Sequence, residues 1–439
     1  MATSCDALLQ VARARSQGRV RGIYSVCSAN RLVLEASMEE ARADHSELLI
    51  ESTSNQVNQF GGYTGIEPPG FVSYVHDIAA RLDFPRDRVI LGGDHLGPHP
   101  WQREPAAVAM DKARELIRQY VLAGYSKIHL DTSMRLGGDA GDAGSPLSDV
   151  TITERAADLA EVAERAHRER PSGAQAPLYV IGTDVPPPGG EREAEHGIWT
   201  TRPQDAERTI ELTRAAFGRL GLGSAFERVI AVVVQPGVEF GDANVFEYAR
   251  PRAATLKELI ERHDDLVYEA HSTDYQTPDA LSEMVEDHFA ILKVGPWLTF
   301  AFREAVFALA EIEREWLGGQ ASATLSGIRE VMERVMLERP AYWHGYYHGD
   351  ELQLGFARRF SYSDRIRYYW PQPQAEAALK RLIANLSERP APLSLISQYL
   401  PVQYNAVRRG QLSPSPENLI RHKILEVLEP YARACRMKG

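Results

Sequence analysis

The sequence predicts a (β/α)₈ barrel, in which eight parallel strands close into a cylinder surrounded by helices. Two observations predict it. Short apolar runs rich in β-branched residues recur eight times, and each ends in a polar or glycine-rich stretch. Segments with apolar residues at helical spacing lie between these runs. Alternation of strand and helix throughout this region indicates a closed parallel sheet.

Each predicted strand is a short run bounded by turn residues. The strands are expected at residues 21–27, 47–52, 88–94, 127–131, 178–184, 228–235, 265–272 and 289–295. Helical patterns between them include residues 32–45, 71–82, 106–124 and 205–221. An open doubly wound sheet is the alternative, but it would need fewer strands or a glycine-rich phosphate fingerprint, and the sequence contains neither GxGxxG nor GxxxxGK[ST].

The pattern changes after the eighth strand. Helical segments at 297–316 and 324–340 are followed by aromatic-rich segments at 342–351 and 361–374. No Pro/Gly/Ser-rich linker separates these segments from the barrel. We therefore predict a barrel over residues 1–317 and a helical, aromatic-rich C-terminal extension over residues 318–439 that packs on it.

Composition excludes several functional classes. The chain has 439 residues, a net charge of −11 and no basic block, so a nucleic-acid partner is not expected. No apolar run approaches the roughly 18 residues that a membrane span requires, and residues 1–18 resemble an amphipathic helix rather than a secretory signal. Three scattered cysteines form no disulfide framework. We expect a cytoplasmic, oligomeric protein without a membrane partner.

Polar residues that directly follow the predicted strands are the strongest candidates for chemistry, because barrel active sites lie at the carboxyl ends of the strands. Imidazole and carboxylate groups together suit Zn²⁺ or Mn²⁺, and a divalent ion beside a free carboxylate assists proton removal next to a carbonyl. A single histidine at a strand end is more often structural, so the joint pattern carries the prediction. The residues are Asp94, His95, Asp131, Asp184, Gln235, Glu239 and His271.

His129 is an open case. It alternates with Ile128 and Leu130 within the fourth strand and therefore points to the opposite face from them. That face could be the barrel interior, where core packing and function are equally compatible with the pattern.

Two further segments suggest substrate binding. The loop at 52–65 is dense in amides and hydroxyls, so Asn55, Gln56 and Gln59 are candidates for contacts with sugar hydroxyls, although a turn-rich loop would have the same composition. Loops after the seventh and eighth barrel strands commonly bind phosphate. The candidates there are Ser272, Thr273, Lys293 and Gly295. Arg365 and Arg367 could clamp a phosphate from the extension, or form an arginine–aromatic packing contact.

The motifs ILGGDHLGP (90–98), LIESTSNQVNQFGGYTG (49–65), VYEAHSTDYQT (267–277) and SDRIRYYWP (363–371) resemble the Z-type subunit family of D-tagatose-1,6-bisphosphate aldolase. The matching blocks extend in order from about residue 25 to residue 401. Members of this family are described as non-catalytic, chaperone-like aldolase subunits, as tagatose 6-phosphate kinases, or as metal-dependent C4-epimerases that convert D-tagatose 6-phosphate to D-fructose 6-phosphate.

The family is similar in turn to class II ketose-bisphosphate aldolases, barrels that hold a divalent metal with three histidines. This resemblance implies that Asp94 is the base, that His95 and His271 are metal ligands, and that GTDVPPPGGE (182–191) places Asp184 near the metal. The segment QPGVEF replaces the aldolase GxxHG motif, so Glu239 is the implied third ligand. The HGxSG and NxxT phosphate segments are also altered, to HSTDY and KVGP.

The resemblance therefore implies a metal-dependent C4-epimerase of ketose phosphates in tagatose and galactitol catabolism. The cofactor is expected to be zinc, with manganese or magnesium as alternatives, and the ligand a small sugar phosphate. The competing hypothesis is a non-catalytic subunit that stabilises a separate catalytic aldolase subunit. A kinase is disfavoured because the sequence has no recognisable nucleotide-phosphate loop.

Overall fold

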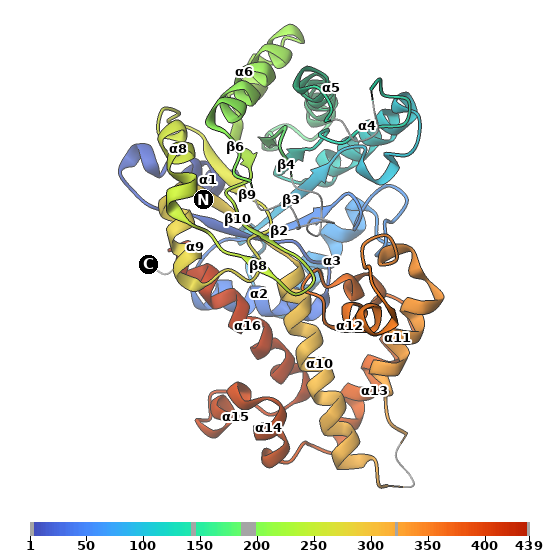
Figure 1. Ribbon diagram of the computed structural model, residues 1–439. Coiled ribbons are helices and arrows are strands. Elements are labelled where there is room, and N and C mark those ends of the chain that lie inside the picture. Colours follow the sequence, from blue (N-terminus) through green and yellow to red (C-terminus); the bar gives the residue numbers. More distant parts are fainter. Residues whose placement is uncertain (1–3, 142–145, 186–198, 321–323, 437–439) are drawn as a thin grey trace.

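The computed structural model of the chain describes residues 4–141, 146–185, 199–320 and 324–436. Eight parallel strands form a closed barrel in the order β1-β10-β9-β6-β5-β4-β3-β2, and helices surround it (Figure 1). This confirms the predicted fold. The strands are β1 (Ile23–Val26), β2 (Leu48–Thr53), β3 (Val89–Leu96), β4 (Lys127–Leu130), β5 (Leu178–Ile181), β6 (Val229–Val234), β9 (Val267–Ala270) and β10 (Phe289–Val294).

The outer helices follow the strands along the chain. Several begin at residues that favour helix starts: Asn30 accepts the N–H groups of Leu32 and Val33 at the start of α2, and Thr277 accepts that of Ala280 at the start of α9. The outer helices are α2 (Arg31–Ala43), α3 (Pro68–Arg81), α4 (Ala106–Ala123), α5 (Asp149–Arg168), α6 (Pro203–Arg219), α8 (Arg250–Ile260), α9 (Pro278–Glu286) and α10 (Pro296–Leu317). A short helix α7 (Gly223–Phe226) and a hairpin of β7 (Glu239–Phe240) and β8 (Val245–Phe246) complete this region.

Apolar side chains fill the N-terminal end of the barrel lumen. Inward-facing residues such as Leu49, Ile90 and Ile291 form a buried cluster there with Leu8 and Val11 of α1 (Ser4–Arg13). The N-terminal helix therefore covers this end of the barrel. A second apolar cluster lies between the strands and the outer helices.

Inward-facing residues nearer the carboxyl ends of the strands are charged. Glu51 of β2 and Lys127 of β4 are fully buried in the lumen. Gly92 on β3 is required beside them, because a Cβ at this position would lie 2.3 Å from Glu51 Oε1. The lumen thus changes from apolar to charged along the strands.

The C-terminal extension is helical, as predicted, and it packs on the barrel. Its helices are α11 (Ile328–Glu338), α12 (Glu351–Phe360), α13 (Pro373–Glu388), α14 (Leu393–Tyr399), α15 (Pro401–Arg408) and α16 (Pro416–Ala434). The last of these returns to pack against α2, α9 and α10 (Figure 1). A 3₁₀ segment, η6 (Arg365–Tyr369), brings aromatic and basic side chains to the mouth of the barrel.

Among the described residues, no helix combines the length and the apolar character needed to cross a bilayer.

Candidate active site at the barrel mouth

A β-bulge at the end of β3 brings two neighbouring residues to the site. Gly93 pairs with Ile128 and Leu96 pairs with Leu130, so Asp94 and His95 together oppose His129. Neighbouring residues in a regular strand point to opposite faces, and a bulge relaxes this alternation. His95 has a φ of 46°, a left-handed conformation that is rare for a residue with a side chain. Backbone strain of this kind is concentrated at functional sites.

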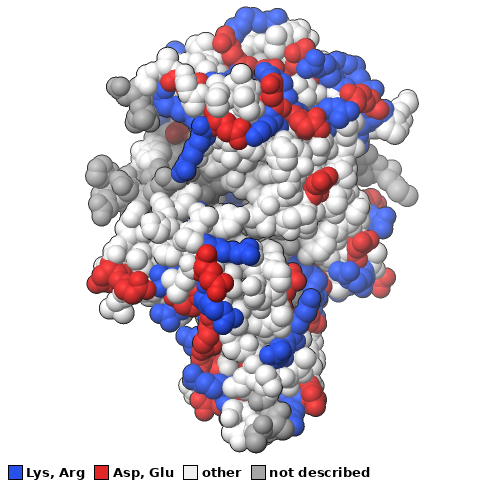
Figure 2. All heavy atoms as spheres, turned by 90° about the vertical axis from the view of Figure 1, so that its right-hand side faces the viewer, with Lys and Arg blue, Asp and Glu red and all other residues white. Residues whose placement is uncertain are grey.

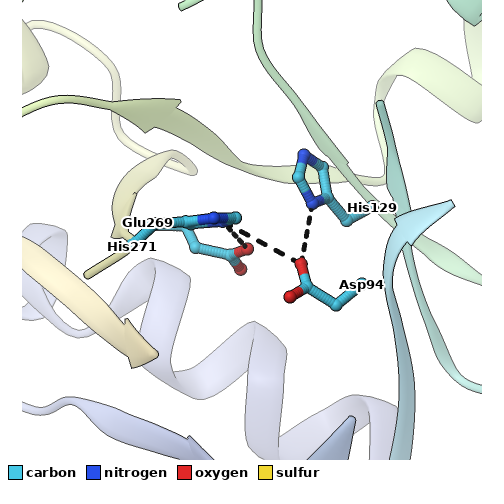
Figure 3. A group of neighbouring side chains, drawn as sticks. All are labelled: Asp94, His129, Glu269 and His271. Carbon is cyan, nitrogen blue, oxygen red and sulfur yellow. Dashed lines mark hydrogen bonds and ion pairs between the residues drawn. The ribbon is translucent and has the colours of Figure 1, made fainter. Parts of the chain in front are cut away.

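Asp94 lies between two histidines (Figure 3). Its Oδ1 is 2.9 Å from His129 Nδ1 and 3.9 Å from His271 Nε2. His271 directly follows β9, and its Nε2 is also 3.1 Å from Oε1 of Glu269. Residues from three strands, β3, β4 and β9, therefore meet at one point in the lumen.

His95 is oriented by a second carboxylate. Its Nδ1 is 2.7 Å from Asp131 Oδ2, and its Nε2 is 3.8 Å from Asp94 Oδ2. Its ring centroid lies 4.8 Å from that of His271. A carboxylate that holds one imidazole nitrogen and leaves the other facing a site is the arrangement found behind metal-binding histidines.

Buried ion pairs hold the charged layer together. Lys127 Nζ lies 2.5 Å from Glu51 Oε1 and 2.6 Å from Glu269 Oε2. Lys293 of β10 contacts Glu51 and lies 3.0 Å from Asp94 Oδ1. The ion pairs join β2, β3, β4, β9 and β10 across the lumen.

The surroundings shift the pKa values of these groups. Burial alone would raise the pKa of Asp94, but the imidazoles of His95 and His271 and the contact with His129 hold it well below its usual range. Burial lowers the pKa of Lys293 to about 8, although the neighbouring Cys27 opposes this shift. Asp94 is therefore a carboxylate at neutral pH.

The residues present fit a divalent metal ion. Asp94, His129, Glu269 and His271 each offer a nitrogen or oxygen atom, and these four atoms lie within 4.8 Å of one another. Mixed imidazole and carboxylate ligands suit Zn²⁺ and Mn²⁺. Cys27, Glu51 and Asp94 form a second such group, but there the ammonium of Lys293 already contacts Glu51 and Asp94.

The three predicted metal ligands differ in their position relative to this four-residue group. His271 belongs to the four-residue group, and His95 lies beside it. Glu239 is buried on β7, where its Oε1 accepts the N–H of Phe240, and Phe240 lines the cavity next to the site. Of the three residues that the sequence suggested, His271 therefore belongs to the four-residue group, which also contains His129.

A cavity of ≈ 70 Å³ lies directly beside Asp94, His95 and His271. It adjoins a larger pocket of ≈ 340 Å³ between the barrel and the extension. Four residues line both: Cys27, Gln56, Tyr63 and Arg367. The side of the molecule shown in Figure 2 is hollowed in its middle band, where few charged side chains are exposed, below an upper part that is rich in charges. The cavity and the pocket together give a small polar ligand a place beside Asp94.

The predicted sugar-binding loop reaches this cavity in part. Asn55 and Gln56 line it, and Gln56 donates from Nε2 to the carbonyl of Cys27. Gln59 instead donates to the carbonyl of Lys112 on α4. Gln235 accepts the N–H groups of Gly237 and Val238 and so shapes the turn after β6.

Asp184 follows β5 and is bonded to two residues just before α6. Its Oδ2 accepts hydrogen bonds from Thr201 Oγ1 and Trp199 Nε1. The segment GTDVPPPGGE, which connects Asp184 to the aldolase resemblance, continues into residues 186–198, outside the described residues. The role of Asp184 stays a prediction.

The groups predicted to hold phosphate after β9 and β10 make bonds within the protein. Thr273 Oγ1 donates to the carbonyl of Lys293, and the N–H of Gly295 donates to Asp274. Lys293 is ion-paired with carboxylates. Ser272 lines the cavity with a left-handed φ of 54°.

The two arginines of η6 differ in position. Arg365 donates to the carbonyl of Tyr342 and lies over the rings of Tyr346 and Tyr368, which is the packing alternative. Arg367 lines the cavity beside Asp94 and donates to the hydroxyl of Tyr368. Of the two, Arg367 is therefore the one that can meet a ligand there.

Several residues of the site were not singled out from the sequence. Glu51, Lys127 and Glu269 lie inside predicted strands, and Asp274 lies in the HSTDY segment. A charged residue in the middle of an otherwise apolar strand is itself a signal, because charges are almost never fully buried unless paired.

Comparison with protein families matches residues 8–436 to the family described as D-tagatose-1,6-bisphosphate aldolase subunit GatZ/KbaZ-like. The chain belongs to this family. A crystal structure described as a probable tagatose 6 phosphate kinase from Sinorhizobium meliloti 1021 is 47% identical, with a TM-score of 0.85 over 94% of this chain and 100% of that one. The family membership links the protein to tagatose-bisphosphate aldolase in sugar metabolism.

More distant similarities are to aldolase structures. The YdjI aldolase from Escherichia coli K12 is 11% identical, with a TM-score of 0.39 over 88% of this chain and 97% of that one. The fructose-bisphosphate aldolase from Campylobacter jejuni is 13% identical, with a TM-score of 0.43 over 88% of this chain and 93% of that one.

Proposed function

We propose that the protein is a metal-dependent C4-epimerase that interconverts D-tagatose 6-phosphate and D-fructose 6-phosphate by breaking and re-forming the C3–C4 bond. The observation that carries the proposal is the meeting of Asp94 with His95, His129 and His271 beside a cavity at the carboxyl end of the barrel. The description of the 47% identical relative names tagatose 6 phosphate, which supports this class of substrate.

A divalent cation, zinc or alternatively manganese or magnesium, would polarise the ketose carbonyl and stabilise the negative charge that develops when the C3–C4 bond breaks. The proposed ligands are His95, His271 and Glu239, with His129 as the alternative third ligand because it belongs to the four-residue group. Asp131 would orient His95 through its Nδ1.

Asp94 is the proposed base because it is ionised and lines the cavity. It takes the proton of the C4 hydroxyl as the C3–C4 bond breaks, which leaves an aldehyde at C4. The aldehyde turns, the bond re-forms on its other face, and the proton is returned to the new hydroxyl. Asp184 is the alternative base.

The aldehyde must stay bound while it turns. Gln56 and Tyr63 from the loop after β2 and Tyr368 from η6 line the cavity, and the rings of Tyr63 and Tyr368 pack edge to face with centroids 4.7 Å apart. These side chains close the mouth over the site and limit the escape of the fragment.

A second function is supported by the description of the family as an aldolase subunit. In this case the chain would bind and stabilise a catalytic aldolase subunit without turning over substrate itself. Substituting Asp94 or His95 would then leave activation of the partner unchanged.

One assay separates these functions. Purified chain is incubated with D-tagatose 6-phosphate and Zn²⁺, Mn²⁺ or Mg²⁺, with and without ATP, and formation of D-fructose 6-phosphate, ketose bisphosphate and ADP is measured. D-fructose 6-phosphate formed without ATP supports the epimerase, whereas a ketose bisphosphate and ADP formed from ATP support the kinase named for the relative. Failure to form any product with every metal, on phosphorylated and free ketoses, removes the epimerase proposal.

Metal analysis tests the ligands. His95→Ala and His271→Ala are each expected to lose the bound ion, and Glu239→Gln and His129→Phe identify the third ligand by which of them weakens binding. An ion retained by both histidine variants rules out the proposed site.

A further inference from the structure

The start of α10 lies at the mouth of the barrel, directly after the eighth barrel strand. In many barrels this helix end binds phosphate, because its backbone N–H groups are unpaired and its dipole favours negative charge. The helix has 22 residues and begins after Gly295, which lines the cavity beside Asp94. The chain therefore has the backbone arrangement on which such an anion site is built.

A carboxylate of the protein occupies this position. Asp274, on the loop after β9, accepts the N–H of Gly295 at 3.0 Å and that of Trp297 at 2.8 Å, both on Oδ1. The donors that a phosphate would use are therefore already bonded. An aspartate at a helix N-terminus also satisfies the helix dipole.

The second carboxylate oxygen of Asp274, Oδ2, has a different role from Oδ1. Asp274 is 2% exposed and lines the same cavity as Asp94 and His271, and its bonds to other described residues fall on Oδ1. Oδ2 is therefore left as an acceptor of a hydrogen bond from a ligand. A hydroxyl can supply that bond, whereas a phosphate would bring a second negative charge against the carboxylate.

The cavity also has two basic side chains. Lys293 and Arg367 are the lysine and arginine among its described lining residues. Lys293 is ion-paired with Glu51 and Asp94. Arg367 bonds the carbonyl oxygens of Ser363 and Asp364 and the hydroxyl of Tyr368, and so forms no close ion pair with a carboxylate of the described chain. Arg367 also lines the adjoining pocket of ≈ 340 Å³, which has room for an anionic group.

We propose that Asp274 makes the site selective for ketoses whose C1 end carries a hydroxyl, and excludes those that carry a phosphate at C1. The C1 hydroxyl donates to Asp274 Oδ2 beside α10, and a phosphate at the other end of the sugar is directed toward Arg367. This inference rests on the proposed ketose chemistry for the orientation of the sugar. It excludes 1-phosphates and 1,6-bisphosphates as ligands of this chain.

The test compares ligand affinities by titration calorimetry with the metal-loaded chain. The ligands are D-fructose 6-phosphate and D-fructose 1-phosphate, and the variant is Asp274→Asn, whose amide oxygen can still accept both N–H groups of α10. Asp111→Asn is the matched control, because that carboxylate is on the surface and pairs with Arg114.

We expect the unmodified chain to bind the 6-phosphate at least about 100-fold more tightly than the 1-phosphate, since like charges brought together at a binding site cost several kcal/mol. Asp274→Asn should reduce this ratio by about 10-fold or more through tighter binding of the 1-phosphate, as one pair of like charges is removed. Asp111→Asn should leave the ratio unchanged. Equal affinities in the unmodified chain, or an unchanged ratio in Asp274→Asn, would overturn the inference.

The outcome is separable from that of the proposed function, because binding requires no turnover. A ratio that shifts as expected in a chain without epimerase activity supports the inference and removes the epimerase. Epimerase activity together with an unchanged affinity ratio in Asp274→Asn supports the epimerase and overturns the inference about Asp274. If neither ketose phosphate binds, inorganic phosphate serves as the probe: binding gained in Asp274→Asn supports the exclusion, and binding that is equal or absent in both chains overturns it.

Discussion

The two ends of the barrel lumen are built by the same strands and have opposite character. On β2, Leu49 joins the apolar cluster under α1, and Glu51, two residues later, joins the ion pairs beneath the active site. On β10, Ile291 and Lys293 divide in the same way. Inward-facing residues two positions apart on one strand thus pack in the apolar end of the lumen and contribute charge to the active-site end. The comparison teaches that burial of apolar side chains at one end of the lumen can offset the unfavourable burial of charged side chains at the other end.

The largest effect is expected at the charged end, from removal of the proposed base. Asp94→Asn should reduce kcat for epimerisation by about 10²–10⁴-fold, the usual contribution of a positioned proton carrier. Lys293 retains Glu51 as a partner in this variant, so the fold should persist. Steady-state kinetics and a urea unfolding curve measure the two quantities. Full activity in Asp94→Asn would transfer the role of base to Asp184.

Loss of one buried cation tests whether the charged end depends on complete pairing. Lys127→Met should reduce the free energy of unfolding by about 3–5 kcal/mol, because it leaves Glu51 and Glu269 buried without this partner. Chemical denaturation at neutral pH measures the change. Arg114→Met, which breaks surface ion pairs, is the control and should change stability by less than about 1 kcal/mol. Similar values for both would mean that the lumen is hydrated.

The apolar end should affect stability without affecting chemistry. Leu8 is fully buried on α1, and Leu8→Ala should reduce the free energy of unfolding by about 2–4 kcal/mol through lost contacts and the cavity left behind. Turnover below the unfolding transition should stay close to that of the unmodified chain. A large fall in kcat in the folded variant would show that the two ends are coupled.

The smallest effect is expected from a residue that acts through its neighbour. Asp131→Asn removes the charge that orients His95 and should weaken metal binding by about 10–100-fold, as substitutions behind metal-binding histidines do. Competition with a chelator of known affinity measures this change. Unaltered affinity would indicate that His95 is not a ligand.

Much of the barrel could be predicted because its signal is local. Each strand is a short apolar run and each helix a periodic one, and the polar residues at the strand ends, such as Asp94, His95 and His271, were placed at the mouth by the fold alone. The barrel geometry converts eight separate positions into neighbours without any knowledge of side-chain contacts.

The side-chain contacts between elements could not be predicted from the sequence to the same extent. The β-bulge that brings Asp94 and His95 together against His129 depends on the register between β3 and β4, which the sequence of either strand does not encode by itself. The role of Asp274 depends on the position of Gly295 and Trp297, more than twenty residues away on another element. Site residues that can be recognised from their place at the end of a strand were predicted from the sequence. Site residues whose role depends on a contact with another element were not.

The last helix of the extension has a consequence for how the site is assembled during synthesis. Tyr431 on α16 donates its hydroxyl to the carbonyl of Thr273, on the loop that carries His271 and Asp274. The barrel strands emerge from the ribosome long before this tyrosine does, and domains generally begin to fold as their segments emerge. The loop therefore receives one of its anchors only after every barrel strand has been synthesised. A chain that stops before Tyr431 would have all eight barrel strands and yet lack a fully anchored active-site loop.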